Sequence, residues 1–133
     1  MNPSDAQAWL NRYIAAWRSN EPELIKALFT DEAAYSFRPW RSDTATVRGH
    51  QAIVEAWLEE DDAPGSWEAS YEPFAIEGDR VVATGWSDYP GRDGGRGEKY
   101  FNCFLLQFAP DGRCAEFTEY WMQEPATATE ESS

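Results

Sequence analysis

Basic residues, cysteines and long apolar runs are all scarce in this chain of 133 residues. Eleven Lys and Arg stand against twenty-four Asp and Glu, so the formal net charge is −13 with the one His neutral. Nucleic acids and anionic membrane surfaces both attract basic clusters, so this charge argues against both as partners. No apolar run approaches the ~18–20 residues of a membrane span. The first residues also lack the basic and apolar regions of a signal peptide, so a cytoplasmic protein is expected.

The residues of several familiar catalytic centres are missing as well. Two cysteines are too few for a disulfide scaffold. One His and scattered carboxylates do not have the ligand spacing of a zinc or iron site. The Gly-x-Ser-x-Gly pattern of a serine hydrolase does not occur. We therefore expect neither a metal nor another cofactor.

Aromatic residues, by contrast, are plentiful. The chain has seven Trp, six Tyr and seven Phe. Each such ring buries about 150–250 Å² when packed, so these side chains fill a core, line a cavity or cover an interface. The length suits one domain, since domains commonly hold about 100–150 residues. We place that domain over residues 1–124 and expect a disordered tail over residues 125–133, which are rich in Thr, Ser and Glu.

Helical periodicity begins near the start of the chain. Ser4 and Gln7 have the spacing of a capping box. The apolar residues behind them recur every three or four positions, which predicts a helix over residues 5–19. Asn20 is expected to cap a second helix, whose apolar face runs to Phe29.

The rest of the chain is predicted to form one more helix and a set of strands. Apolar and polar residues alternate with a period of two in most of it, as they do in half-buried strands. Helices first and antiparallel strands after them predict an α+β domain, with helices packed on one face of a curved sheet. The helix is expected over residues 50–61, the strands over 33–37, 67–76, 81–89, 98–108 and 113–122, and irregular connections over 38–49 and 90–97.

Four passages, in matching order and spacing, carry a family resemblance: Tyr13-Ile14, Leu28 to Ala33, Gly49 to Ile53, and Phe108 to Trp121. They resemble the SnoaL-like proteins, a branch of the nuclear transport factor 2-like superfamily, over about residues 4–122. The resemblance implies three N-terminal helices on a strongly curved, mostly antiparallel mixed sheet that encloses a cone-shaped pocket. It also implies homodimers formed through the convex face of the sheet. Because this superfold hosts enzymes, ligand binders and association domains, the function stays open.

The last hairpin can be put in register from its turn. With residues 109–112 as the turn, Phe108 lies opposite Arg113. Since side chains alternate along a strand, facing pairs then share one side of the hairpin together with Leu106. These pairs are Phe104 with Phe117, Asn102 with Glu119, and Tyr100 with Trp121.

The other side of this hairpin is also rich in apolar residues. A strand that is wet on one side would alternate more cleanly, so we expect a second copy of the chain to cover this face; packing under the tail is the alternative. Cys103 and Cys114 are displaced by four positions, about 14 Å along the strands. A disulfide needs Cα atoms within ~7 Å, so two free thiols are expected. This side carries Phe101, Cys103, Leu105, Glu116, Thr118 and Tyr120.

The preceding hairpin closes at Gly78-Asp79, which sets Tyr71 opposite Trp86. Pro73 interrupts its first strand, and proline favours a strand edge or a bulge. The aromatic side of this hairpin is a candidate wall of the pocket. It is expected to carry Trp67, Tyr71, Val82, Thr84, Trp86 and Asp88.

Glu119 is the leading candidate for chemistry in the pocket. Phe104, Phe117 and Trp121 would remove its carboxyl from water and raise its pKa, which suits a proton carrier. The alternative is a structural Glu119, held by Tyr or Trp donors or by an Arg of residues 38–48.

Three further polar residues join Glu119 as candidates. Asn102 would orient the carboxyl or a substrate oxygen, Asp88 is a second carboxylate near the mouth, and Tyr13 would donate a hydrogen bond to a developing oxyanion. An apolar and flat ligand is expected, because aromatic rings dominate the lining. The expected lining residues are Trp17, Tyr35, Phe37, Trp40, Trp57, Trp67, Tyr71, Trp86, Tyr100, Phe104, Phe117 and Trp121.

The chain departs from the active relatives that it distantly resembles. Tyr13 matches the oxyanion-stabilising Tyr of ketosteroid isomerases, but their catalytic base falls on Phe37 and their protonated Asp on Phe104, and phenylalanine carries no proton. Limonene epoxide hydrolases use carboxylates bridged by Arg, whereas the one Arg-x-Asp here lies in a predicted loop. Scytalone dehydratases need paired His residues, and this chain has only His50, at a helix start.

Two functions remain open from the sequence. The first is a pocket protein that binds a small apolar or aromatic molecule and acts as an acid/base isomerase, dehydratase or hydrolase through Glu119. The second is a non-catalytic dimeric binding or association module whose rings fill the cone. The first is favoured, because a self-filled core would more often use Leu and Ile than so many Trp.

Overall fold

Three helices and six strands form the part of the chain that this computed structural model describes, namely residues 1–36, 46–59, 67–89 and 98–124. The helices are α1 (Pro3–Ser19), α2 (Pro22–Leu28) and α3 (His50–Glu59). The strands are β1 (Phe29–Ser36), β2 (Thr46–Arg48), β3 (Glu68–Glu77), β4 (Arg80–Tyr89), β5 (Glu98–Phe108) and β6 (Cys114–Gln123).

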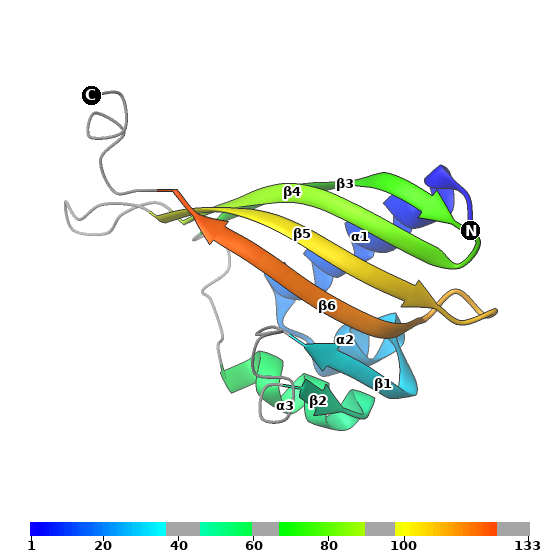
Figure 1. The fold of residues 1–133 in the computed structure, drawn as a ribbon. Helices are drawn as coiled ribbons and strands as arrows, with labels where there is room; N and C mark the ends of the chain where they lie inside the picture. The colour runs from blue at the N-terminus through cyan, green and yellow to red at the C-terminus, as the bar shows by residue number, and fades with distance from the viewer. Residues whose placement is uncertain (37–45, 60–66, 90–97, 125–133) are drawn as a thin grey trace, which may run out of the picture.

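The strands form one sheet in the order β2-β1-β6-β5-β4-β3. β1 pairs with β6 in parallel, and every other neighbouring pair is antiparallel. Figure 1 shows the long strands β3 to β6 curving together over α1, while α2 and α3 lie beside β1 and β2. We call the side of the sheet that faces α1 the inner face and the opposite side the convex face. The α+β class and the curved, mostly antiparallel mixed sheet are confirmed.

The core lies between α1 and the inner face. Trp9, Leu10 and Tyr13 of α1 are buried against Phe104 and Phe117 of the sheet. The Trp9 indole also donates a hydrogen bond to the Leu28 carbonyl oxygen at 3.1 Å, which ties α1 to the end of α2. Within the described ranges, no helix is long and apolar enough to cross a membrane.

The predicted caps of the first two helices are wrong. Asn2 caps α1, and its side-chain oxygen accepts from the Asp5 amide at 2.8 Å, so the helix begins at Pro3 rather than after Ser4. Gln7 instead donates to the Tyr71 carbonyl oxygen at 3.0 Å, which joins α1 to β3. A proline at each helix start explains the shift, because proline suits the first turn, where its missing N–H costs nothing.

Asn20 ends α1 instead of starting α2. It adopts the left-handed conformation with φ of 56°, and its amide donates to the Ala16 carbonyl oxygen. α2 then runs only to Leu28, and Phe29 opens β1 as a buried residue. β1 therefore begins four residues earlier than predicted.

The segment between β1 and α3 contains a short strand that the sequence did not reveal. β2 pairs with β1 through Val47 and Tyr35. The predicted helix over 50–61 corresponds to α3, and its last two residues lie outside the described ranges. The same holds for Phe37, Trp40, the connection over 90–97 and the tail over 125–133.

The last hairpin has the predicted faces but different pairs. Phe104 lies opposite Glu119, not Phe117, and Asn102 lies opposite Trp121. The loop is one residue longer than predicted, and a bulge between Gln107 and Phe108 adds a second residue to β6. Beyond the bulge a slip of two residues keeps the side chains on their predicted faces, because the side-chain period of a strand is two.

The β3–β4 hairpin has the predicted turn, but the prediction that the residues of β4 share a face with Trp67 and Tyr71 of β3 is wrong. Pairing follows the predicted register from the turn to Ala75 and Val82 and then shifts at a bulge, so Tyr71 lies opposite Gly85 rather than Trp86. Beyond the bulge the error is one residue, which moves a side chain to the other side of the sheet. The convex face therefore carries Val82, Thr84, Trp86 and Asp88, while Trp67 and Tyr71 are buried.

Candidate functional site

A line of polar side chains crosses three neighbouring strands on the inner face. Glu119 of β6, Asn102 of β5 and Ser87 of β4 follow one another diagonally across the sheet. The Asn102 amide nitrogen donates to the Glu119 carboxylate at 2.9 Å, and the Ser87 hydroxyl donates to the Asn102 amide oxygen at 3.2 Å. Because Asn102 is 7 % exposed and Ser87 is 3 % exposed, these bonds replace water at both side chains.

Ser87 determines which way the Asn102 amide points. An amide has an acceptor oxygen at one end and a donor nitrogen at the other. Since the Ser87 hydroxyl occupies the oxygen, the nitrogen is directed at Glu119. The Tyr71 hydroxyl hydrogen-bonds to Ser87 in turn, so the polar line runs from Tyr71 through Ser87 and Asn102 to Glu119.

Two buried tyrosines accompany this line. Burial, followed by the proximity of Tyr35, Glu119 and Tyr71, raises the pKa of Tyr13 well above its ordinary value. Burial also raises the pKa of Tyr71; its hydrogen bond with Ser87 opposes that rise, and the nearby Glu119 adds to it. Both hydroxyls therefore keep their protons at neutral pH.

On the deep side of the polar line, aromatic rings fill the space between α1 and the sheet. The Tyr13 ring lies 5.6 Å from that of Phe104, 5.5 Å from Phe117 and 5.3 Å from Trp57. Tyr35 stacks on Phe117 at 4.5 Å. Phe104 and Phe117 are 0 % and 1 % exposed, so here these predicted lining residues pack against one another.

A second row of rings lies on the other side of the polar line, and its members are less buried. Trp17 and Tyr89 lie 6.2 Å apart, Tyr89 and Tyr100 5.8 Å, and Tyr100 and Trp121 5.4 Å. Trp121 is directly opposite Asn102 and is 46 % exposed. We call Trp17, Tyr89, Tyr100 and Trp121 the outer ring row.

Trp67 belongs to the packing that supports this row. It stacks on Trp17 at 3.7 Å and is 1 % exposed. The Arg18 guanidinium covers it, 4.7 Å from the ring centre. Trp67 is therefore a buried support of the row rather than a surface that a ligand meets.

Two predicted site residues lie on the wrong side of the sheet. Trp86 and Asp88 face the convex side, where the Lys99 ammonium lies 5.1 Å from the Trp86 ring and 5.6 Å from Phe101. The predicted places of Trp86 in the lining and of Asp88 at the mouth are both wrong, because the β3 bulge shifts the pairing of β3 with β4 by one residue, so these side chains do not share a face with Tyr71. Ser87, between them, is the inner-face residue that sequence reasoning missed.

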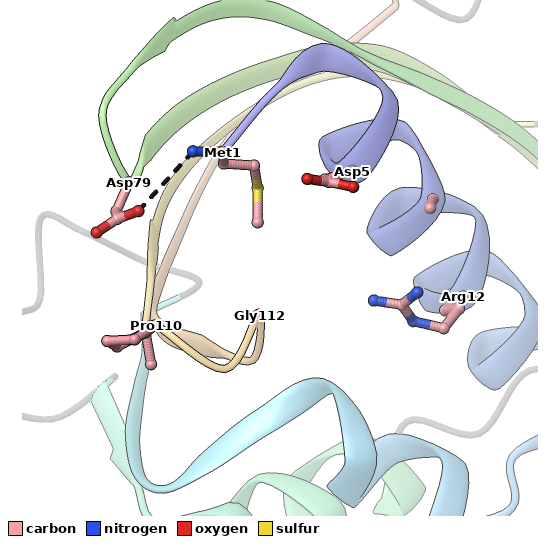
Figure 2. A pocket seen from close by; sticks show the side chains of 8 residues that line it. Met1, Asp5, Arg12, Asp79, Pro110 and Gly112 are labelled. Carbon is pink, nitrogen blue, oxygen red and sulfur yellow. Dashed lines mark ion pairs between the residues drawn. The ribbon is translucent and has the colours of Figure 1, made fainter.

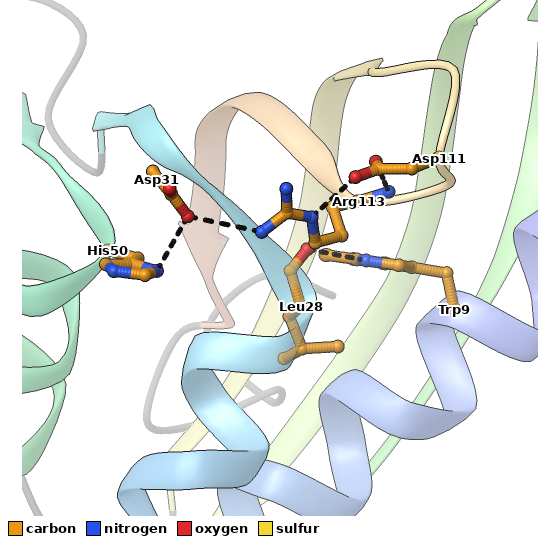
Figure 3. A network of polar contacts seen from close by, with 6 residues as sticks. All are labelled: Trp9, Leu28, Asp31, His50, Asp111 and Arg113. Atoms are coloured by element: carbon orange, nitrogen blue, oxygen red, sulfur yellow. Dashed lines mark hydrogen bonds and ion pairs between the residues drawn. The ribbon is translucent and has the colours of Figure 1, made fainter.

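His50 takes part in a separate polar network. Figure 3 shows Asp31 of β1 between His50 at the start of α3 and Arg113 beside the β5–β6 turn. Asp31 lies 3.6 Å from the His50 ring and 3.3 Å from Arg113, whose guanidinium also donates to Asp111 at 2.8 Å. The hydrogen bonds from Arg113 lower the pKa of Asp111. This network joins β1, α3 and the turn, and it contains none of the predicted site residues.

A hollow of about 320 Å³ lies at the start of α1, among the tight turns of the sheet. Figure 2 shows Asp5 and Arg12 projecting from α1 toward Pro110 and Gly112. The Met1 ammonium donates to the Gly78 carbonyl oxygen at 3.0 Å. None of the predicted site residues lines this hollow.

Both cysteines are free thiols, as predicted. Cys114 is buried, and burial raises the pKa of its thiol, while Cys103 is half-buried on the convex face. Among the described residues, no three His, Cys, Asp or Glu side chains are grouped as metal ligands would be.

Three helices on a curved, open, mixed sheet with an aromatic inner face define a nuclear transport factor 2-like α+β cone. Residues 10–117 match the model of the SnoaL-like domain, so the chain belongs to the SnoaL-like family. By sequence it matches none of the curated proteins.

Solved structures of similar fold share little sequence with this chain. A nuclear transport factor 2-like protein of unknown function from Cytophaga hutchinsonii is 13 % identical, with a TM-score of 0.64 over 87 % of this chain and 98 % of that one. A putative ketosteroid isomerase from Kribbella flavida is 19 % identical, with a TM-score of 0.64 over 98 % and 89 %. An LEH-like epoxide hydrolase from M. tuberculosis is 13 % identical, with a TM-score of 0.63 over 90 % and 84 %. At these identities the likeness shows the fold alone.

Proposed function

We propose that this protein binds a small, largely apolar molecule on the inner face and exchanges a proton with it through Glu119. The observation that carries the proposal is the 2.9 Å hydrogen bond from Asn102 to Glu119, held between two layers of aromatic rings. A carboxylate that accepts a hydrogen bond from Asn102 and lies beside partly exposed rings is positioned to take a proton from a ligand and return it.

Three residues of the polar line and the nearby Tyr13 each have a part in such a reaction. Glu119 is the proton carrier, Asn102 holds its carboxylate, and Ser87 holds Asn102. Tyr13, which keeps its proton, supplies a donor to an oxygen that becomes negative. Isomerisation, dehydration and hydrolysis all use this kind of proton transfer, and the similar folds of a putative ketosteroid isomerase and an epoxide hydrolase support this range.

The test uses Glu119→Gln beside Asp88→Asn, which makes the same change to a carboxylate on the convex face. Tryptophan fluorescence is titrated with a panel of small cyclic and aromatic molecules, and products of any that bind are followed by NMR. We expect saturable binding by the wild type, turnover that Glu119→Gln abolishes and Asp88→Asn preserves, and unchanged thermal stability in both variants. Binding by none of the panel, or turnover that survives in Glu119→Gln, contradicts the proposal.

A second function, that of a dimeric association module, is supported by a different observation. The convex face exposes Phe101, Leu105 and Tyr120 by 46 %, 42 % and 47 %, and Met122 by 71 %. Large apolar side chains gathered on one face of a sheet are typical of an interface. We therefore propose a homodimer through the convex face, which leaves the inner face of each copy available.

A further inference from the structure

We propose that the hollow at the start of α1 is a second binding site, and that it takes a small zwitterion, an amino acid whose ammonium and carboxylate are joined by a short chain of methylenes. This site is separate from the inner face, because no residue of the polar line or of the outer ring row lines it. Binding there does not require that the inner face binds a ligand.

Three segments that are far apart in the chain enclose the hollow. Asp5, Ala8 and Arg12 follow one another in α1 at intervals of three and four residues, so they share one face of the helix. The opposite walls are the turn that contains Asp79, before β4, and the turn that contains Pro110, before β6. The volume of about 320 Å³ is at the lower end of the range for small-molecule pockets, roughly 300–1,000 Å³, and suits a ligand as small as an amino acid.

The hollow contains one basic and one acidic side chain whose charges are not used. Across the described part of the chain, neither the Arg12 guanidinium nor the Asp5 carboxylate has a hydrogen bond or an ion pair. Asp79, by contrast, lies 3.9 Å from the Met1 ammonium. Figure 2 shows the Arg12 and Asp5 side chains projecting from α1 into the space between the helix and the turns. Both are therefore available to a molecule that enters this space.

The spacing of these two charges favours a ligand that carries both signs. Seven residues of α-helix span about 10 Å, and helical side chains lean toward the N-terminus, so the Arg12 side chain extends toward Asp5. The two groups nevertheless form no ion pair, which requires charged atoms within about 4 Å. A molecule with a carboxylate at one end and an ammonium at the other is able to join them.

The chemistry of the walls agrees with such a ligand. A guanidinium binds a carboxylate through two parallel hydrogen bonds, and the Asp5 carboxylate accepts hydrogen bonds from an ammonium. Ala8 lies between the two charges on the helix and Pro110 lies on the opposite wall, so the methylenes of the ligand meet apolar surface. A zwitterion has no net charge and is not repelled by the −13 of the chain, whereas a simple anion is repelled.

A series of ω-amino acids tests both the charges and their separation. Glycine, β-alanine, 4-aminobutyrate and 5-aminopentanoate are titrated into the ¹⁵N-labelled protein, and their binding is followed by NMR. Butylamine and butyrate, which carry only one of the two charges, are titrated beside them. We expect saturable binding by at least one of the two longer amino acids, with shifts of the Ala8, Asp79 and Gly112 amides and not of Asn102. Butylamine and butyrate should bind roughly tenfold more weakly, because each lacks one charged contact.

Three variants assign the binding to this hollow. Arg12→Gln and Asp5→Asn each remove one charged contact, and each should weaken the amino acid about tenfold. Arg80→Gln is the matched control, because Arg80 directly follows Asp79 but does not line the hollow. It should bind as the wild type does, and the amide spectrum shows whether each variant is folded.

Several outcomes would overturn the proposal. If none of the four amino acids binds saturably, or if the shifts centre on Asn102, the hollow is not the site. If Arg80→Gln weakens binding as much as Arg12→Gln, the effect comes from the overall charge of the chain. If butyrate binds as tightly as 4-aminobutyrate, Arg12 takes a simple anion and the zwitterion is wrong.

Discussion

Gly85 is the residue on which the Tyr71 end of the polar line depends. A Cβ at this position would overlap the backbone oxygen of Ser70 and the ring of Tyr71. Only glycine therefore lets the Tyr71 ring lie against β4 and its hydroxyl reach Ser87.

Gly85→Ala is expected to destabilise the fold by about 1–3 kcal/mol, the usual cost of overpacking a close contact. Because the overlapped oxygen belongs to the backbone, rotation of a side chain cannot relieve it. Urea unfolding followed by circular dichroism measures the change. Thr84→Ala, one residue away on the convex face, is the control, and an equal loss in both variants would show that Gly85 has no special role.

Tyr13 predicts how stability changes in alkaline solution. Its pKa is raised in the folded state, so above about pH 10, where a free tyrosine loses its proton, the folded chain holds a proton that the unfolded chain has released. The free energy of unfolding should therefore be steady from pH 7 to 9 with respect to this group, and should fall as pH rises beyond 10.

The comparison is made with Tyr13→Phe, by urea unfolding at pH 8 and pH 11. The variant is expected to be less stable than the wild type at both pH values, since it loses the hydrogen bond with Tyr35. Its free energy of unfolding should, however, fall less between pH 8 and pH 11 than that of the wild type. An identical fall in both proteins would contradict the assignment.

At the scale of helices and strands, faces could be predicted more readily than pairs. Glu119 and Asn102 share the inner face as predicted, because the longer loop and the β6 bulge each add one residue and together restore the period of two. Ser87 was missed because β3 contains a single bulge. The sequence did contain a signal of the bulge, because the alternation of apolar and polar residues is broken by Phe74-Ala75-Ile76 directly after Pro73.

Helix boundaries were obscured by competing polar residues. Asn2, Ser4 and Asn20 all belong to residue types that cap helices, and local pattern alone does not say which of two neighbours does so. The observed caps follow from Pro3 and Pro22, each of which opens a helix. β2 has only three residues and pairs with β1 through contacts distant in sequence, so it had no periodicity to detect.

The cap of α1 can be tested directly. Asn2→Ala removes the side-chain oxygen that accepts from the Asp5 amide, and should cost about 1 kcal/mol of stability. Ser4→Ala should have little effect, because Ser4 is an exposed residue inside the first turn. Thermal unfolding of the two variants decides between the caps, and the reverse order of losses would restore the capping box at Ser4.

For the whole molecule, the convex face predicts the oligomeric state. Leu105→Glu places a charge in the apolar patch and should convert a dimer to a monomer in sedimentation equilibrium. Leu24→Glu is a matched control, since Leu24 on α2 is exposed to a similar extent, 45 % against 42 %, but lies away from this face. A monomeric wild type, or dissociation by both variants, would contradict the proposed interface.

The two thiols give an independent measurement of the same interface. Cys103 lies on the convex face, so its alkylation should slow as protein concentration rises and dimers form. Cys114 is buried and its thiol pKa is raised, so it should react only after unfolding. Alkylation of Cys103 at the same rate at every concentration would count against the dimer.

The β3 bulge sets the local bend of the sheet edge that α1 meets through the hydrogen bond from Gln7 to Tyr71. Phe74 is the extra residue of that bulge, and its side chain is 76 % exposed. Its deletion would leave the paired residues on either side in register and remove only the local bend that a bulge imposes on a strand. Removal of this single residue would therefore change the curvature of the sheet beside α1 while the pairing of β3 with β4 stays the same.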